Sequence, residues 1–264
     1  RIFCDLFSAK ENALSLINAL SGIKCTDPNE LEIMTLSDVL YITKKNDFAV
    51  CIRGALSLVE QNSTINPNMP LRGLIYFGQE YDKWVTMHNL NSKIYSSKLV
   101  KIPQPLYYVL YNGMADAPAY EEQRLSNAFI NPSRGYEWTA HVYNIRSGKN
   151  DELLDKCPAL KGYSTFVENI YINQEAGLSL DESVSKSADY CIKHGLISDY
   201  LTERKGELMQ MTLGEISLED MKEVWYEEGV EDGIERERNE KVRRFLIMYN
   251  NDIENASKLF DIPV

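Results

Sequence analysis

Two acidic residues flank a short apolar segment in NDFAVCIRGALSLVEQNSTINPNMPLR, residues 46–72. Asp47 comes before the segment and Glu60 lies at its end. If Arg53 and Gly54 form a two-residue hairpin loop, the numbers of paired residues sum to 107 and Asp47 faces Glu60. Opposed residues on antiparallel strands have Cβ atoms about 5 Å apart on one face of the sheet. Two carboxylates there would repel each other by roughly 3 kcal/mol.

A divalent cation between the two carboxylates would offset this repulsion. Mg²⁺ is typically held by one or two carboxylates, with water and phosphate oxygens in its other positions. Two alternatives stay open at this point. Both acids could be solvated at the end of a strand, where water screens them, or a bulged three-residue loop at Gly54 could shift the register by one residue.

The segments around this pair predict an α/β fold. Apolar residues at helical spacing, followed by a stop at Ser21-Gly22, predict a helix over residues 3–22. Three segments rich in β-branched and aromatic residues predict a strand meander, and Pro70 lies in the tolerated first turn of a long predicted helix. The predicted strands are 39–45, 48–52 and 55–59, with a fourth at 106–113 after the helix over 70–90.

The second half of the chain is mainly helical after a predicted strand over residues 141–146. Ser179 and Glu182 have the spacing of a capping box before a helix over 181–195. Residues 214–240 hold 11 acidic and 3 basic residues, a local charge of −8. We therefore predict a core over residues 1–148 and a helical C-terminal region over 149–264 that carries an acidic arm.

Composition narrows the class of protein. The 264 residues are 44% hydrophobic and 25% charged, which indicates a globular chain rather than a disordered one. Five cysteines without a CxxC pair and three isolated histidines give no zinc-site spacing, and we expect reduced thiols in a cytoplasmic protein. No apolar run is long enough to span a membrane. The net charge of −11 argues against nucleic acid, but only −3 of it lies outside the acidic arm.

The segment that contains Asp47 and Glu60 resembles the signature of the Rpn family of recombination-promoting nucleases and putative transposases, a branch of the PD-(D/E)XK nuclease superfamily. In that family, ND at the start of one strand is followed by a glutamate at the end of the next strand, and then by TxNPNMPLR leading into a helix. The match is close over STINPNMPLRGLIYFGQEYDK. It continues in KENALSLINAL, DVLYITKKND and IYSSKLVKIPQPLYYVLYNG, and the long string NPNMPLR makes it specific.

This resemblance implies a PD-(D/E)XK nuclease-like core of helix, three-strand meander, helix and strand. It implies that Asp47 and Glu60 bind a divalent metal, Mg²⁺ with Mn²⁺ or Ca²⁺ as alternatives, and that Glu11 of the first helix supports them. The position two past the glutamate is lysine in the superfamily and glutamine in much of this branch, and here it is Asn62. Gln61 is expected on the opposite strand face, unless a bulge lets it take the glutamine's part.

The resemblance also implies function and partners. We expect a metal-dependent DNA endonuclease linked to recombination, mobile elements or phage defence, which self-associates through its C-terminal region. Arg72 and Tyr76, one helical turn apart, are candidates for DNA phosphate contacts, with a core Tyr76 and a structural Arg72 as the alternative. Further candidates are Lys44, Lys45, Lys98 and Lys101.

A second function remains open because Asn62 carries no charge with which to stabilise a phosphate. The chain would then be a catalytically impaired nuclease-fold protein that acts as a DNA-binding or protein-interaction module.

Overall fold

The computed structural model describes residues 2–34, 48–131 and 135–208. These residues belong to one compact unit, Arg1–Glu215. A second unit, Ile216–Val264, lies outside the described residues. The predicted acidic arm over residues 214–240 and the predicted strand over 39–45 also lie outside them.

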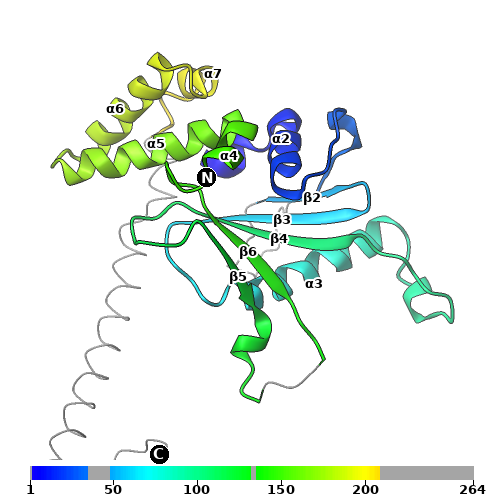
Figure 1. Ribbon diagram of the computed structural model, residues 1–264. Helices are drawn as coiled ribbons and strands as arrows, with labels where there is room; N and C mark the ends of the chain where they lie inside the picture. The colour runs from blue at the N-terminus through cyan, green and yellow to red at the C-terminus, as the bar shows by residue number, and fades with distance from the viewer. Residues whose placement is uncertain (1, 35–47, 132–134, 209–264) are drawn as a thin grey trace, which may run out of the picture. The chain divides into compact units, whose positions relative to one another are not determined.

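A mixed six-stranded sheet with helices on both faces forms the centre of the described residues, and the predicted α/β class is confirmed (Figure 1). The strand order is β1-β2-β3-β4-β6-β5. The β3/β4 and β4/β6 pairs are parallel and the other three pairs are antiparallel. The strands are β1 (Glu32–Ile33), β2 (Phe48–Ile52), β3 (Ala55–Asn62), β4 (Gln104–Tyr111), β5 (Tyr120–Arg124) and β6 (Thr139–Asn144).

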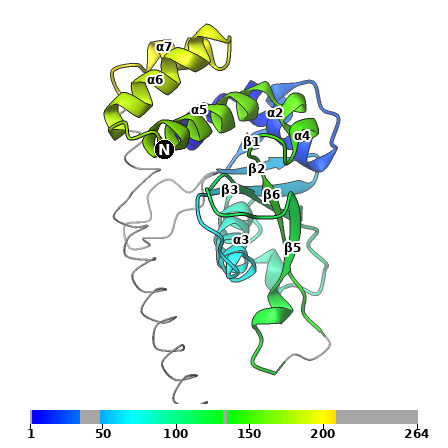
Figure 2. The same cartoon turned by 60° about the vertical axis from the view of Figure 1, so that its left-hand side comes forward.

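Helix α3 covers one face of the sheet, and α2, α4 and α5 lie over the other face, with α6 and α7 outside α5 (Figures 1 and 2). Short 3₁₀ turns occupy Pro28–Glu30, Lys93–Tyr95 and Leu125–Ala128. The α-helices are α1 (Ile2–Leu6), α2 (Lys10–Ser21), α3 (Met69–Met87), α4 (Asp151–Lys156), α5 (Pro158–Glu175), α6 (Leu180–Lys193) and α7 (Ser198–Glu203).

The first predicted helix is divided, so the prediction of one continuous helix over residues 3–22 is wrong. The hydroxyl of Ser8 donates a hydrogen bond to the Asp5 carbonyl at 2.7 Å, and Ala9 has an extended backbone. Serine side chains that bond to the backbone compete with helical hydrogen bonding, which accounts for the break. The predicted end is confirmed, because Gly22 has the left-handed conformation of a helix C-cap.

The predicted hairpin register is confirmed over the described residues of β2 and β3. The pairs run from Phe48 opposite Val59 to Ile52 opposite Ala55. Arg53 and Gly54 both have positive φ, 47° and 78°, as a two-residue type I′ loop requires. The bulged alternative is therefore wrong. Asp47, the next residue before this ladder, lies outside the described residues.

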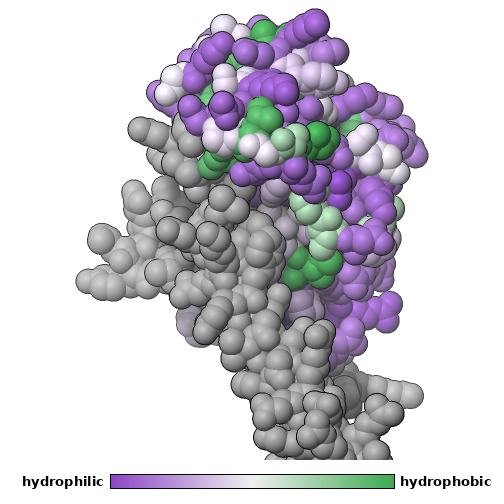
Figure 3. Space-filling model, turned by 90° about the vertical axis from the view of Figure 1, so that its left-hand side faces the viewer, coloured by the Kyte–Doolittle hydropathy of each residue, from purple (hydrophilic) through white to green (hydrophobic). Residues whose placement is uncertain are grey.

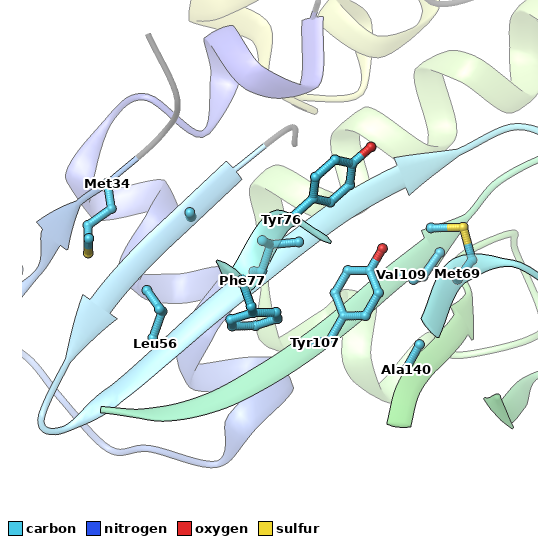
Figure 4. Close-up of a cluster of buried hydrophobic side chains, with 10 residues drawn as sticks. Met34, Leu56, Met69, Tyr76, Phe77, Tyr107, Val109 and Ala140 are labelled. Carbon is cyan, nitrogen blue, oxygen red and sulfur yellow. The ribbon is translucent and has the colours of Figure 1, made fainter. Parts of the chain in front are cut away.

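Both faces of β3 are buried, because helices cover the sheet on each side. From Ala55 to Glu60 every residue is buried. On the α3 face, Figure 4 shows a cluster in which Tyr76 and Phe77 of α3 lie against side chains from the strands. On the other face, Phe3 packs edge-on against Tyr163 of α5. A strand that is buried on both faces between two layers is typical of α/β sheets.

Two further predictions about helices are confirmed, and two strands, β1 and β5, were missed. Helix α3 begins with Met69 and Pro70, and α6 begins with the Ser179–Glu182 capping box. Edge strand β5, with the sequence YEEQR, is polar and mostly exposed, so it lacks the apolar alternation that predicts a strand. On the face drawn in Figure 3, hydrophilic residues predominate among the described residues and hydrophobic ones form small groups.

Candidate functional site

Glu60 is a buried carboxylate near the carboxyl end of β3, with only 2% of its surface exposed. Its Oε1 accepts a hydrogen bond from Nη2 of Arg72, in the first turns of α3, and the two residues form an ion pair. Its Oε2 accepts a hydrogen bond of 2.5 Å from the Tyr107 hydroxyl on β4. Both carboxylate oxygens therefore have a donor, as a buried charge requires.

Helix α3 brings Arg72 and Tyr76 to Glu60 from one side of the helix, because residues four apart share a face. The Tyr76 hydroxyl lies 3.4 Å from Nε and 3.3 Å from Nη2 of Arg72, and the guanidinium carbon lies 5.9 Å from the Tyr76 ring centre. We call Glu60, Arg72, Tyr76 and Tyr107 the Glu60 site. Figure 4 shows the hydroxyl groups of Tyr76 and Tyr107 pointing to the same side.

Gly73 allows Tyr107 to reach Glu60. A Cβ atom on Gly73 would lie 2.6 Å from two ring carbons of Tyr107 and 2.9 Å from Nε1 of Trp138. Real Cβ atoms do not approach other atoms so closely, so α3 packs onto β4 at this distance only with glycine here. The backbone of α3 thus sets the position of Tyr107 beneath it.

The electrostatics of the Glu60 site follow from burial and from the Glu60 charge. Burial by itself would lower the pKa of Arg72, but the Glu60 carboxylate and then the Tyr76 hydroxyl outweigh burial and raise the pKa. Burial raises the pKa of Tyr107 far above its ordinary value, and the neighbouring Glu60 raises it further. Arg72 is therefore a cation and Tyr107 a neutral hydrogen-bond donor at neutral pH.

Asn62 lies two residues after Glu60 on the same face of β3. Its Nδ2 approaches the Met69 sulfur at 3.7 Å. Gln61 lies on the opposite face, as strand alternation predicts, and its Nε2 donates to Asn112 Oδ1 at 2.7 Å. The structure therefore gives no bulge that would bring Gln61 to Glu60.

A small pocket opens beside Asn62 at the carboxyl ends of β3, β4 and β6. Its cavity volume is about 40 Å³, and its wall combines side-chain amides with an apolar floor. This volume is enough for a few water molecules. The lining includes Asn62, Asn66, Met69, Val109, Gln123 and Asn144.

The remaining predicted site residues are not brought to the Glu60 site by any described contact. Glu11 is exposed in the first turn of α2, on the far side of the sheet from α3. Lys98 and Lys101 are exposed in the segment that leads into β4. The predicted residues Asp47, Lys44 and Lys45 lie outside the described residues.

One residue of the Glu60 site, Tyr107, was not predicted from the sequence. Tyr107 is 1% exposed and contacts Glu60 directly, yet LYYVLY offers several tyrosines of equal appearance. The parallel register of β3 and β4 would have identified it, because Leu58 lies opposite Tyr107 on the same face as Glu60. Tyr76 is also 1% exposed and belongs to the core cluster, which matches the alternative of a core tyrosine.

No protein-family model, curated protein or solved structure matches this chain. Within the described ranges, no group of three or more histidine, cysteine, aspartate and glutamate side chains is arranged to hold a metal ion. None of the described helices combines the length and the apolar character needed to cross a bilayer.

Proposed function

We propose that this chain is a metal-dependent DNA endonuclease of the PD-(D/E)XK type, which hydrolyses phosphodiester bonds at a site formed by Glu60 and Asp47. The observation that carries the proposal is a buried carboxylate, Glu60, at the end of a strand whose hairpin register is the one the sequence predicted. The sequence prediction pairs Glu60 with Asp47, which lies outside the described residues. The resemblance of NDF…NPNMPLR to the Rpn family supports the same reading.

The carboxylate oxygens of Glu60 are of the ligand type that suits a hard divalent cation, because Mg²⁺ and Mn²⁺ prefer carboxylate oxygens as ligands. Glu60 and Asp47 would hold the cation, which would polarise a phosphate and lower the pKa of a bound water. Asn62 borders a pocket with room for water, so its amide would orient the attacking water by hydrogen bonding. Water would add to phosphorus and one P–O bond would break, leaving a phosphomonoester end and a hydroxyl end.

Arg72 would bind a phosphate oxygen of the DNA in this proposal. Its side chain is 30% exposed, whereas that of Glu60 is 3% exposed, so Arg72 is the member of this ion pair that substrate can reach. A guanidinium presents paired donors that match phosphate geometry. Tyr76 would act from the core by supporting the Arg72 guanidinium rather than by direct contact with DNA.

A second candidate function is a nuclease fold without turnover, which binds DNA or protein. The observation that favours it is that Arg72 and Tyr107 already hold both oxygens of Glu60. In that case the Glu60 site is a structural ion pair, and Asn62 in place of lysine or glutamine reflects lost catalysis.

Cleavage of supercoiled plasmid, measured with Mg²⁺, Mn²⁺, Ca²⁺ or EDTA, tests the proposed function. We expect nicked or linear DNA with Mg²⁺ or Mn²⁺, none with EDTA, and loss of cleavage in Glu60→Gln and in Asp47→Asn. Glu152→Gln is the matched control, because Glu152 is an exposed carboxylate on α4. Absence of cleavage in every metal, with DNA binding retained, would favour the second candidate function.

A further inference from the structure

The small pocket beside Asn62 lies at the carboxyl ends of three neighbouring parallel strands. Asn62, Tyr111 and Asn144 are the last residues of β3, β4 and β6, and the strand registers place them in one row. All three residues line the pocket. Open α/β sheets bind their ligands outside the carboxyl ends of parallel strands. The pocket therefore occupies the part of the sheet where a ligand is expected.

The floor of this pocket is apolar and narrow. Val109 of β4 lies opposite Val142 of β6 in the register, and Met69 of α3 lies beside Val109 (Figure 4). The cavity volume of about 40 Å³ holds about three water-sized groups, whereas a cavity that binds benzene measures about 150 Å³. The pocket thus excludes an aromatic ring and accepts an unbranched chain.

Glu121 and Gln123 of β5 form a polar end of the pocket. Glu121 lies opposite Val142 in the ladder, so its side chain is on the face of the sheet that carries the pocket floor. Gln123 lies on the same face, and its Nε2 donates to Glu121 Oε2 at 3.4 Å. The Oε1 atom of Gln123 is buried and accepts no hydrogen bond from any described residue. Within the described part of the chain, Glu121 has no cationic partner.

A carboxylate and a carbonyl oxygen without a donor are both acceptors, and the carboxylate is negative. A primary ammonium group matches them, because it is positive and has three donors and no acceptor. Glu121 is exposed, so an ammonium group beside it keeps part of its water while its alkyl chain is buried. Asn62 lies three strand spacings from Glu121, about 14 Å, so one ammonium group contacts only the Glu121 end.

We propose that this pocket binds a primary ammonium group on an unbranched alkyl chain. The ammonium group donates to Glu121 and Gln123, and the chain lies over Val109 and Val142. The side chain of a lysine and a free alkylamine both present this chemistry. The inference goes beyond the proposed function, because neither a metal, nor Glu60, nor cleavage of DNA is part of it.

The shape of the pocket is tested with a series of amines, whose dissociation constants are measured by saturation-transfer NMR on the full chain. We expect propylamine to bind about fourfold more tightly than ethylamine, because it buries one more methylene group. Pentylamine should bind like propylamine, since the pocket holds only about three water-sized groups. tert-Butylamine, which is branched, should bind at least about tenfold more weakly than propylamine.

The charge is tested with 1-propanol and with variants of β5. 1-Propanol has the size of propylamine without its charge and should bind about fivefold more weakly, the upper value for one exposed ion pair. Glu121→Gln should weaken propylamine binding by a similar factor. Glu122→Gln is the matched control, because it removes an exposed carboxylate from the adjacent residue on the other face of β5 and should bind propylamine like the parent. Gln123→Leu, which removes the buried acceptor, should also bind propylamine more weakly than the parent.

A lysine whose amino and carboxyl groups are blocked by acetyl and methylamide groups distinguishes the two sources of the ammonium group. Binding as tight as that of propylamine supports the side chain of a lysine, and binding at least about tenfold weaker supports a free amine, because the blocked backbone is then too bulky for the pocket. Three results would overturn the inference: no binding of propylamine, equal binding of 1-propanol and propylamine, or equal losses in Glu121→Gln and Glu122→Gln. Plasmid cleavage has no bearing on these results, so the inference and the proposed function fail separately.

Discussion

Two arginine–glutamate pairs lie near opposite ends of β3, and their surroundings differ. Arg53, in the turn that begins β3, pairs with Glu30 at 2.7 Å, with side chains 47% and 38% exposed. Arg72 pairs with Glu60 near the end of β3, where the side chains are 30% and 3% exposed. An exposed pair contributes little to the free energy of unfolding, because water solvates each charge even when the partner is absent. A buried pair makes each partner depend on the other, so breaking it leaves an uncompensated charge.

The largest expected effect comes from Arg72→Met, which leaves the Glu60 carboxylate buried without its cation. We expect the free energy of unfolding, measured with urea, to fall by about 3 kcal/mol, the low end for a broken buried pair because Arg72 is partly exposed. The double variant Arg72→Met, Glu60→Met should recover most of this loss, since neither charge remains. A loss below about 1 kcal/mol would make this pair resemble an exposed one.

A smaller effect is expected from Gly73→Ala, which acts on the buried site through packing rather than charge. The new methyl group would overlap the Tyr107 ring and push it from Glu60. Overpacking of this kind costs about 1 to 3 kcal/mol. Urea unfolding measures the loss.

Gly78→Ala on the same helix is the matched control for Gly73→Ala. No atom lies within 4 Å of a Cβ built on Gly78, so we expect a gain of about 0.5 to 1 kcal/mol from the helix preference of alanine. If both substitutions changed stability in the same direction, the close approach of α3 to Tyr107 would not control the site.

The sequence predicted the elements around Glu60 well because they depend on local patterns. The Arg53-Gly54 loop sets the β2/β3 register, and Pro70 lies at the start of α3. Local turn chemistry and alternating burial are sufficient for both. The break between α1 and α2 was missed because one serine side chain competes with a helix that the apolar spacing favours.

The partners of Glu60 were harder to predict because they depend on tertiary packing. Arg72 was selected for DNA phosphate, and no local feature showed that it lies within hydrogen-bonding reach of Glu60, 12 residues earlier. Tyr107 reaches Glu60 across 47 residues through a parallel strand pair. Parallel strands are joined by a long crossover, here through α3, rather than by a tight turn. The rule that pairs residues across a hairpin loop therefore does not predict the register of β3 and β4.

The smallest expected effect is that of Glu30→Gln, which removes one charge of the exposed pair and whose effect on stability depends on pH. The hydrogen bond from Arg53 is the largest cause that lowers the pKa of Glu30 to about 2, from 4.5. A carboxyl group whose pKa is lower in the folded state stabilises the fold above its unfolded pKa, and this contribution disappears as pH falls through the folded pKa. We expect the parent to melt slightly above Glu30→Gln at pH 7, and the difference to shrink as pH falls from about 4.5 toward 2.

Added salt should reduce the difference in melting temperature at pH 7, because exposed charges are screened. A melting-temperature loss as large as that of Arg72→Met, or one that is independent of pH and salt, would show that exposure does not distinguish the two pairs.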